Sequence, residues 1–82
     1  MTPATVEAIR KAVKLVGKEA ATHRFTPEEK QAIADIIYTY RRQGCDTSEN
    51  ELARIAINWL VWDHQAHGEA SILAYVLKAL NE

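Results

Sequence analysis

The chain has 82 residues, a hydrophobic content of 48% and a net charge of −1, which argues against a generally basic nucleic-acid binder. A single domain of this length buries only about 60–65% of the surface that its unfolded chain exposes, so self-association is the expected route to stability. One cysteine, Cys45, excludes an intramolecular disulfide, and no segment approaches the roughly 20 apolar residues that span a bilayer. Residues 1–4 also lack a basic stretch followed by an apolar run, and we expect a cytoplasmic protein.

The charges are unevenly distributed along the chain. Residues 1–24 contain five Lys or Arg and two Glu, which gives a net charge of +3. Residues 47–82 contain two Lys or Arg, four Glu and one Asp, which gives a net charge of −3. An anionic partner is therefore expected to meet the N-terminal part.

Residues 1–20 are expected to form a basic amphipathic helix. From Thr5 onward, apolar residues recur at intervals of three and four, at Val6, Ile9, Val13, Val16 and Ala20. The cationic side chains occupy another face, at Arg10, Lys11, Lys14 and Lys18. This face is either a solvated surface or a set of phosphate contacts.

Residues 21–26 have the alternation of a short strand. With Phe25 turned inward, Thr22, Arg24 and Thr26 form an outward polar row. The alternative is an ordinary loop between helices, because such a short alternation is a weak signal.

Two helix starts are strongly marked. Thr26 with Glu29, and Ser48 with Glu51, have the spacing of capping boxes. The helix that begins after Thr26 is expected to end before Gly44 and to bury Ile33, Ile36, Ile37 and Tyr40.

The helix that begins after Ser48 carries Leu52, Ile55, Ala56, Trp59 and Leu60 at helical spacing, with further apolar residues around most of its circumference. It is predicted to be a central helix that ends at Gly68. A last helix, within residues 69–81, is expected to bury Ile72, Leu73, Val76 and Leu80.

Catalytic and metal-binding patterns are weak. His64 and His67 lie three residues apart near Asp63 and Glu69, but histidines at the end of a helix also interact favourably with its dipole. Cys45 lies in a turn and has no orienting base in the sequence pattern. We therefore expect no enzyme activity, no metal, no cofactor and no small-molecule substrate.

Residues 22–29, Gly44 and residues 47–58 together resemble the ribbon-helix-helix family of DNA-binding proteins. The resemblance implies a mainly α fold with a strand-helix-helix core over residues 21–67, flanked by the basic helix of 1–20 and the C-terminal helix of 69–81. A single strand leaves its backbone groups unpaired, and pairing with a second copy satisfies them. The expected form is therefore an obligate homodimer.

In that family the paired strands enter the major groove of double-stranded DNA. The resemblance implies base contacts by Thr22, Arg24 and Thr26, and phosphate contacts at Thr47 and Ser48. The basic helix adds phosphate contacts at Arg10, Lys11, Lys14 and Lys18. The expected dimer interface consists of Phe25, Leu52, Ile55, Ala56, Trp59 and Leu60. The implied function is sequence-specific DNA binding, as a small transcriptional repressor or a plasmid-partition or antitoxin-type regulator.

The alternative function is a wholly helical module for protein interaction or oligomerisation, in which residues 21–26 are a loop and no DNA is bound. A helix-turn-helix variant is a third option, but the helix from Ser48 is too apolar all round to lie in a DNA groove.

Overall fold

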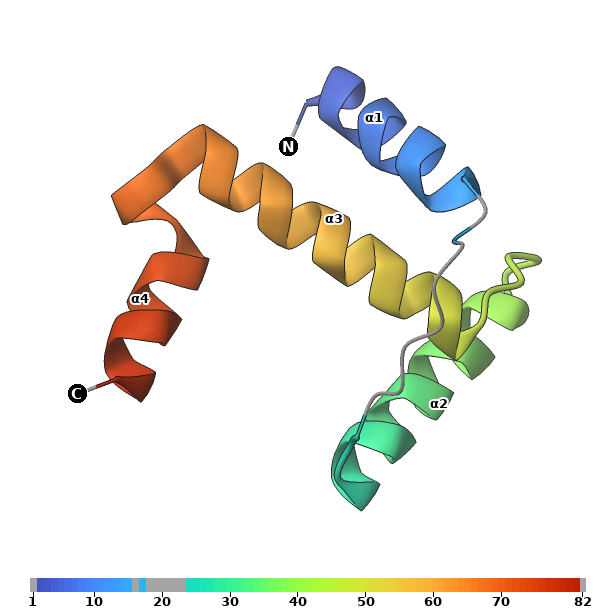
Figure 1. Cartoon of the computed structure of the whole chain (residues 1–82). Coiled ribbons are helices and arrows are strands. Elements are labelled where there is room, and N and C mark those ends of the chain that lie inside the picture. The colour runs from blue at the N-terminus through green and yellow to red at the C-terminus, as the bar shows by residue number, and fades with distance from the viewer. Residues whose placement is uncertain (1, 16, 18–23, 82) are drawn as a thin grey trace.

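The computed structural model describes residues 2–15, 17 and 24–81. Within these residues the elements are α1 (Pro3–Lys14), α2 (Pro27–Arg41), α3 (Glu49–His67), the 3-10 turn η1 (Gly68–Ala70) and α4 (Ile72–Leu80). Figure 1 shows α1 alongside α3, whereas α2 and α4 leave α3 at its two opposite ends. The longest helix, α3, is therefore the element around which the others are arranged.

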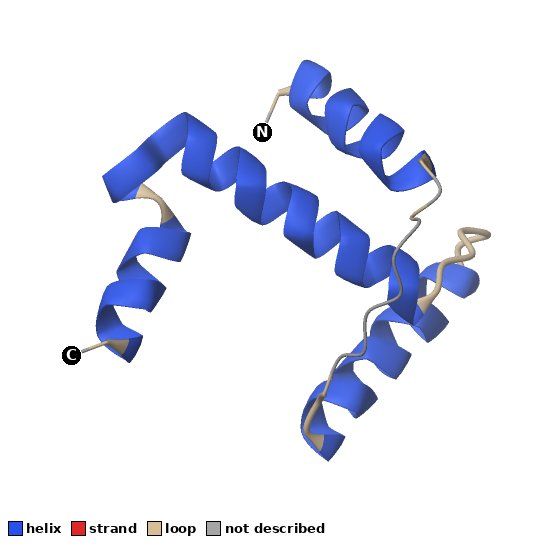
Figure 2. Cartoon of the chain, in the orientation of Figure 1, coloured by secondary structure: helices blue, strands red, loops and turns tan. Residues whose placement is uncertain are grey.

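The predicted ribbon-helix-helix fold is wrong, although the mainly α class is confirmed. In the described part of the chain Figure 2 shows helices and loops and no strand. Residues 24–26 form a loop before α2, while Thr22 lies outside the described residues. Thr26 does adopt an extended backbone, with φ −70° and ψ 160°, but these angles place it as the N-cap of α2. Thr26 is therefore extended because it caps α2, and not because it belongs to a strand.

The four described α-helices begin in the same way. At each start a hydroxyl oxygen accepts a hydrogen bond from the backbone amide three residues later. The pairs are Thr2 with Thr5 at 3.2 Å, Thr26 with Glu29 at 3.1 Å, Ser48 with Glu51 at 3.1 Å, and Ser71 with Ala74 at 3.0 Å. Each bond satisfies one of the amides that a helix start leaves without a partner.

The reciprocal half of the capping box differs between the two predicted starts. At α2 the Glu29 carboxylate accepts a hydrogen bond from the Thr26 amide at 2.8 Å, which confirms the predicted box. At α3 the Glu51 carboxylate instead accepts a hydrogen bond from the Thr47 hydroxyl at 2.9 Å, so the predicted second box forms only its first half, from the Glu51 amide to the Ser48 hydroxyl. Both helix starts are where the sequence predicted them.

Two helices are shorter than the sequence indicated. The helix expected to reach residue 20 ends at Lys14, because Leu15 is already extended with φ −68° and ψ 136°. The C-terminal helix begins at Ile72, because Gly68–Ala70 forms η1 and Ser71 then caps α4. Gly68 makes this turn with a positive φ of 53°, a conformation that glycine adopts without a steric penalty.

The described helices do not enclose an apolar core. Among the described residues, the only buried side chains are Asp63 and Ser71, which are 3% and 1% exposed. The accessible surface of the chain is 6967 Å², whereas a compact protein of 9.2 kDa exposes about 4,900 Å². Its radius of gyration is 14.5 Å, against about 12 Å for a compact domain of this length. The protomer is therefore open.

The faces of α2 and α4 that were predicted to be buried are mostly exposed. In α2 only Ile33 and Ile37 of the predicted set are half-buried, and in α4 only Leu73 is. The remaining members of the two sets are exposed: Ile36, Tyr40, Ile72, Val76 and Leu80. The apolar stripes exist, but the other helices of the described chain do not cover them.

Asp63 joins the end of α3 to the start of α4. One carboxylate oxygen accepts a hydrogen bond from the Leu73 amide at 3.1 Å, and the other lies 3.1 Å from Nδ1 of His67. The His67 ring in turn packs edge-on against Trp62, with ring centroids 5.3 Å apart. Asp63 and the Ser71 hydroxyl together satisfy two amides in the first turn of α4, so this buried polar joint sets the direction of α4.

We expect Asp63→Ala to lower the free energy of unfolding by about 1–3 kcal/mol, because the partly buried Leu73 amide loses its acceptor. Chemical denaturation followed by circular dichroism measures the change. The matched control is Asp46→Ala, since the Asp46 side chain is 90% exposed and should change the stability by less than about 0.5 kcal/mol. Equal losses in both variants would show that Asp63 does not hold α4.

Candidate interaction surface

A strongly apolar hollow lies between α2 and α3. This groove, called here the α2–α3 groove, has a volume of about 540 Å³. Its lining residues are Phe25, Ile33, Ile36, Glu49, Leu52, Ala53, Ile55, Ala56, Ile57 and Trp59. Glu49 is the only charged member of this lining. A surface of this kind binds apolar groups through the hydrophobic effect.

Helical periodicity explains how the lining gathers. Leu52, Ile55, Ala56 and Trp59 follow the spacing that places residues on one stripe of α3. The predicted dimer-interface residues Phe25, Leu52, Ile55, Ala56 and Trp59 therefore share one surface, while half-buried Leu60 is not part of the lining.

An ion pair holds α2 against the start of α3. Lys30 Nζ lies 3.0 Å from both carboxylate oxygens of Glu49 and 5.7 Å from the centre of the Phe25 ring. The side chains of both ions are about half exposed, so solvent screens the pair and its contribution is modest. It defines one rim of the groove, while the apolar lining remains accessible: Ile36 is 42% exposed and Ile57 is 50% exposed.

Arg54 anchors α1 to the opposite face of α3. Its guanidinium donates hydrogen bonds to the carbonyl oxygens of Ala12 and Val13, both at 2.9 Å, and to that of Leu15. These carbonyls lie at the end of α1, where a helix leaves its acceptors unsatisfied and its dipole favours a cation. This role of Arg54 cannot be read from the sequence, because the acceptors lie about 40 positions away and are backbone carbonyls, which every residue has.

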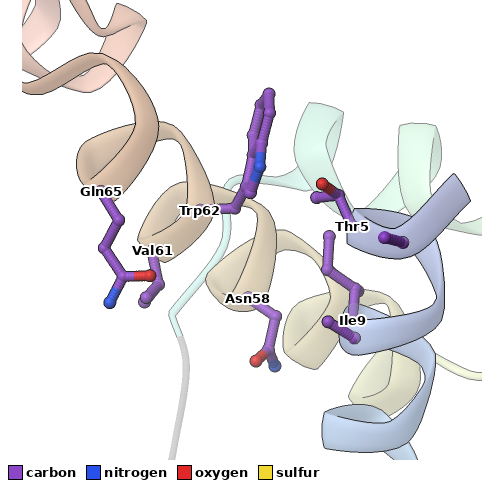
Figure 3. A pocket seen from close by; sticks show the side chains of 8 residues that line it. Thr5, Ile9, Asn58, Val61, Trp62 and Gln65 are labelled. Carbon is purple, nitrogen blue, oxygen red and sulfur yellow. The ribbon is translucent and has the colours of Figure 1, made fainter. Parts of the chain in front are cut away.

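Part of the boundary between α1 and α3 is hollow. A hollow of about 350 Å³ separates the first turns of α1 from the second half of α3. Figure 3 shows the Trp62 indole projecting from α3 beside Thr5 and Ile9 of α1. Because Asn58 and Gln65 also line this hollow, it is less apolar than the α2–α3 groove.

The residues of the basic helix that were predicted to contact phosphate have different surroundings in the structure. Arg10 donates two hydrogen bonds to Glu7, at 2.7 and 2.9 Å, which lower the pKa of the carboxyl group and raise that of the guanidinium. Lys11 and Lys14 are exposed, and neither forms an ion pair within the described part of the chain. Lys18 lies outside the described residues.

The other predicted DNA contacts lie at the starts of α2 and α3. Arg24 is exposed in the loop before α2. The hydroxyls of Thr26 and Ser48 accept hydrogen bonds from helix amides, and that of Thr47 donates to Glu51. These three hydroxyls therefore already have partners within the chain.

The residues considered for catalysis and metal binding are not gathered into a site. No group of three or more His, Cys, Asp or Glu is placed to hold a metal within the described residues. His67 contacts Asp63, whereas Cys45 is exposed. None of the described helices is long and apolar enough to cross a membrane.

Comparisons of the chain with protein-family models, with curated proteins and with solved structures found no match. The family resemblance of residues 47–58 stays an interpretation of the sequence. The function proposed below rests on the burial, the contacts and the charges of the described residues.

We expect Arg54→Ala to release α1 and to lower the free energy of unfolding by about 1.5–3 kcal/mol, because a helix of 12 residues is marginal without tertiary contacts. Hydrogen exchange should then be faster at the α1 amides than at those of α3. The control is Arg42→Ala, an exposed arginine at the end of α2 that contacts Tyr38. Unchanged protection of α1 in Arg54→Ala would contradict the anchoring role.

Proposed function

We propose that this chain is a helical self-association module that binds a second copy through the α2–α3 groove. One observation carries the proposal: no apolar side chain of the described residues is buried, although the chain is 48% hydrophobic. An apolar surface left open in one protomer is stabilised when a partner removes it from water.

The size of the open surface supports an extensive interface. The chain exposes roughly 2,000 Å² more than a compact protein of its mass, which for two copies amounts to roughly 4,000 Å². Obligate homodimers bury about 2,000–5,000 Å² in total, whereas weak encounters bury less than about 1,200 Å². The excess therefore favours a permanent homodimer over a transient contact.

The proposed setting is the cytoplasm. Cys45 is exposed and is the only cysteine in the chain, so it has no intramolecular disulfide partner. A reducing compartment keeps such a thiol free. No catalytic role is part of the proposal.

Binding of duplex DNA is a second candidate, favoured by the exposed Lys11 and Lys14 on α1. Exposed lysines bind phosphates regardless of base sequence. Base reading through a ribbon is not part of this candidate, and a role in transcription, partition or antitoxin control stays a prediction that depends on it.

We expect the wild-type protein to sediment as a dimer at micromolar concentration and Ile36→Asp to sediment as a monomer, because the new carboxylate lies in the apolar groove. Analytical ultracentrifugation measures the mass, and circular dichroism checks that the helices persist. Tyr38→Asp is the control, since Tyr38 is an exposed residue of α2 that does not line the groove. A wild-type monomer at high micromolar concentration would overturn the proposed function.

For the second candidate, Lys14→Ala should weaken binding to every duplex about equally and reduce the salt dependence of log K by about one unit. Fluorescence anisotropy with labelled duplexes at low and moderate salt measures both quantities. Lys78→Ala, on α4 in the acidic part of the chain, is the control. If the wild type binds no duplex at low salt, this candidate is wrong, whatever the oligomeric state.

A further inference from the structure

The face of α4 that points away from α3 is an uncovered apolar stripe. The inner face of α4 carries Leu73, Ala74, Leu77 and Lys78, which line the hollow between α4 and the end of α3. The outer stripe consists of Ile72, Tyr75, Val76 and Leu80, at the spacing of one helix face. Tyr75 is 65% exposed and Leu80 is 74% exposed. This outer stripe carries no charge, since Lys78 is the only charged residue of α4 and lies on the inner face.

The α2–α3 groove and the outer stripe of α4 do not meet within one chain. The Lys30–Glu49 pair holds α2 at the first turn of α3, and Asp63 holds α4 at the last turn. A helix of 19 residues is about 28 Å long, and Figure 1 shows α2 and α4 leaving it at opposite ends. Among the described residues α2 makes no contact with α4. One protomer thus has an apolar groove and an apolar helix that are kept apart.

We propose that the outer stripe of α4 from one copy occupies the α2–α3 groove of a second copy, and that the exchange is reciprocal. This inference rests on the proposed self-association and names the segment that fills the groove. Each chain supplies one groove and one α4. An exchange with two-fold symmetry therefore covers the groove and the outer stripe of both copies and gives a closed dimer. A foreign peptide would cover the groove and leave the stripe of α4 in water.

Charge and area support this occupant. The stripe brings no charge into the groove, so binding requires no uncompensated buried ion. An obligate homodimer buries about 1,000–2,500 Å² of each chain, which matches the roughly 2,000 Å² of excess surface per chain. A contact through the α3 stripes alone leaves the outer stripe of α4 in water, whereas the exchange covers the groove and the stripe of both chains.

Disulfide trapping in the full-length chain tests the exchange. In a Cys45→Ser background, one population carries Val76→Cys in the outer stripe of α4 and the other carries Ala56→Cys in the groove. Mixed and oxidised, they should form a covalent heterodimer. The control pairs Ala56→Cys with Lys78→Cys, on the inner face, and we expect about tenfold less product because a disulfide requires Cα atoms within about 7 Å.

The outcomes separate this inference from the proposed function. A dimer in which Ala56→Cys links only to itself would overturn the exchange and leave self-association standing. A chain carrying both Val76→Cys and Ala56→Cys that closes on itself as a covalent monomer would also overturn it. A protein that sediments as a monomer throughout would overturn both.

A complementation experiment covers the case in which the cysteine variants fail to fold. Val76→Asp and Ile36→Asp should each be monomeric, with wild-type helix content by circular dichroism. In an equimolar mixture, the intact α4 of the Ile36→Asp chain meets the intact groove of the Val76→Asp chain, so heterodimers should form. If Val76→Asp alone stays dimeric, or if the mixture stays monomeric, the exchange is wrong.

Discussion

An apolar side chain leaves water only when neighbours surround it, and in the described chain α3 is the one element that every other helix contacts. Each of α1, α2 and α4 packs against a different part of α3. None of the three packs against another of them. Helices that share one central neighbour cover that neighbour in part and leave their own outer faces open. The absence of buried apolar residues in the described chain follows from this arrangement.

Polar contacts set the geometry of the protomer. Arg54 binds the carbonyls at the end of α1, Asp63 binds an amide at the start of α4, and Lys30 pairs with Glu49 between α2 and α3. Such contacts are directional and fix where a helix lies, but each hydrogen bond contributes only about 0.5–3 kcal/mol and the half-exposed ion pair less than about 1 kcal/mol. The exposed apolar faces are those that the proposed self-association would cover. We infer that the protomer is arranged for association, with its polar joints made internally and its apolar faces kept open.

The two faces of α3 serve different purposes in this view. One face carries Arg54 and Trp62 and receives the cationic helix α1, and the other carries Leu52, Ala56 and Trp59 and forms the groove. Self-association through the groove leaves the exposed lysines of α1 on a separate surface. A dimer formed in this way would present two basic helices, one from each copy, to an anionic partner.

The sequence by itself determined the local features of this protein. The starts of α2 and α3 were predicted from Thr26 and Ser48, because a capping hydroxyl and its amide lie three residues apart. The stripe from Leu52 to Trp59 followed from the period of the helix in the same way. Within the described residues, only the tertiary structure decided that residues 24–26 form a loop, since a strand depends on a partner that six residues do not specify. The roles of Arg54 and Asp63 were equally hidden, because each acts on backbone atoms 10 to 42 positions away. Contacts at that distance depend on where whole helices lie relative to one another, and this placement is not encoded in any single turn.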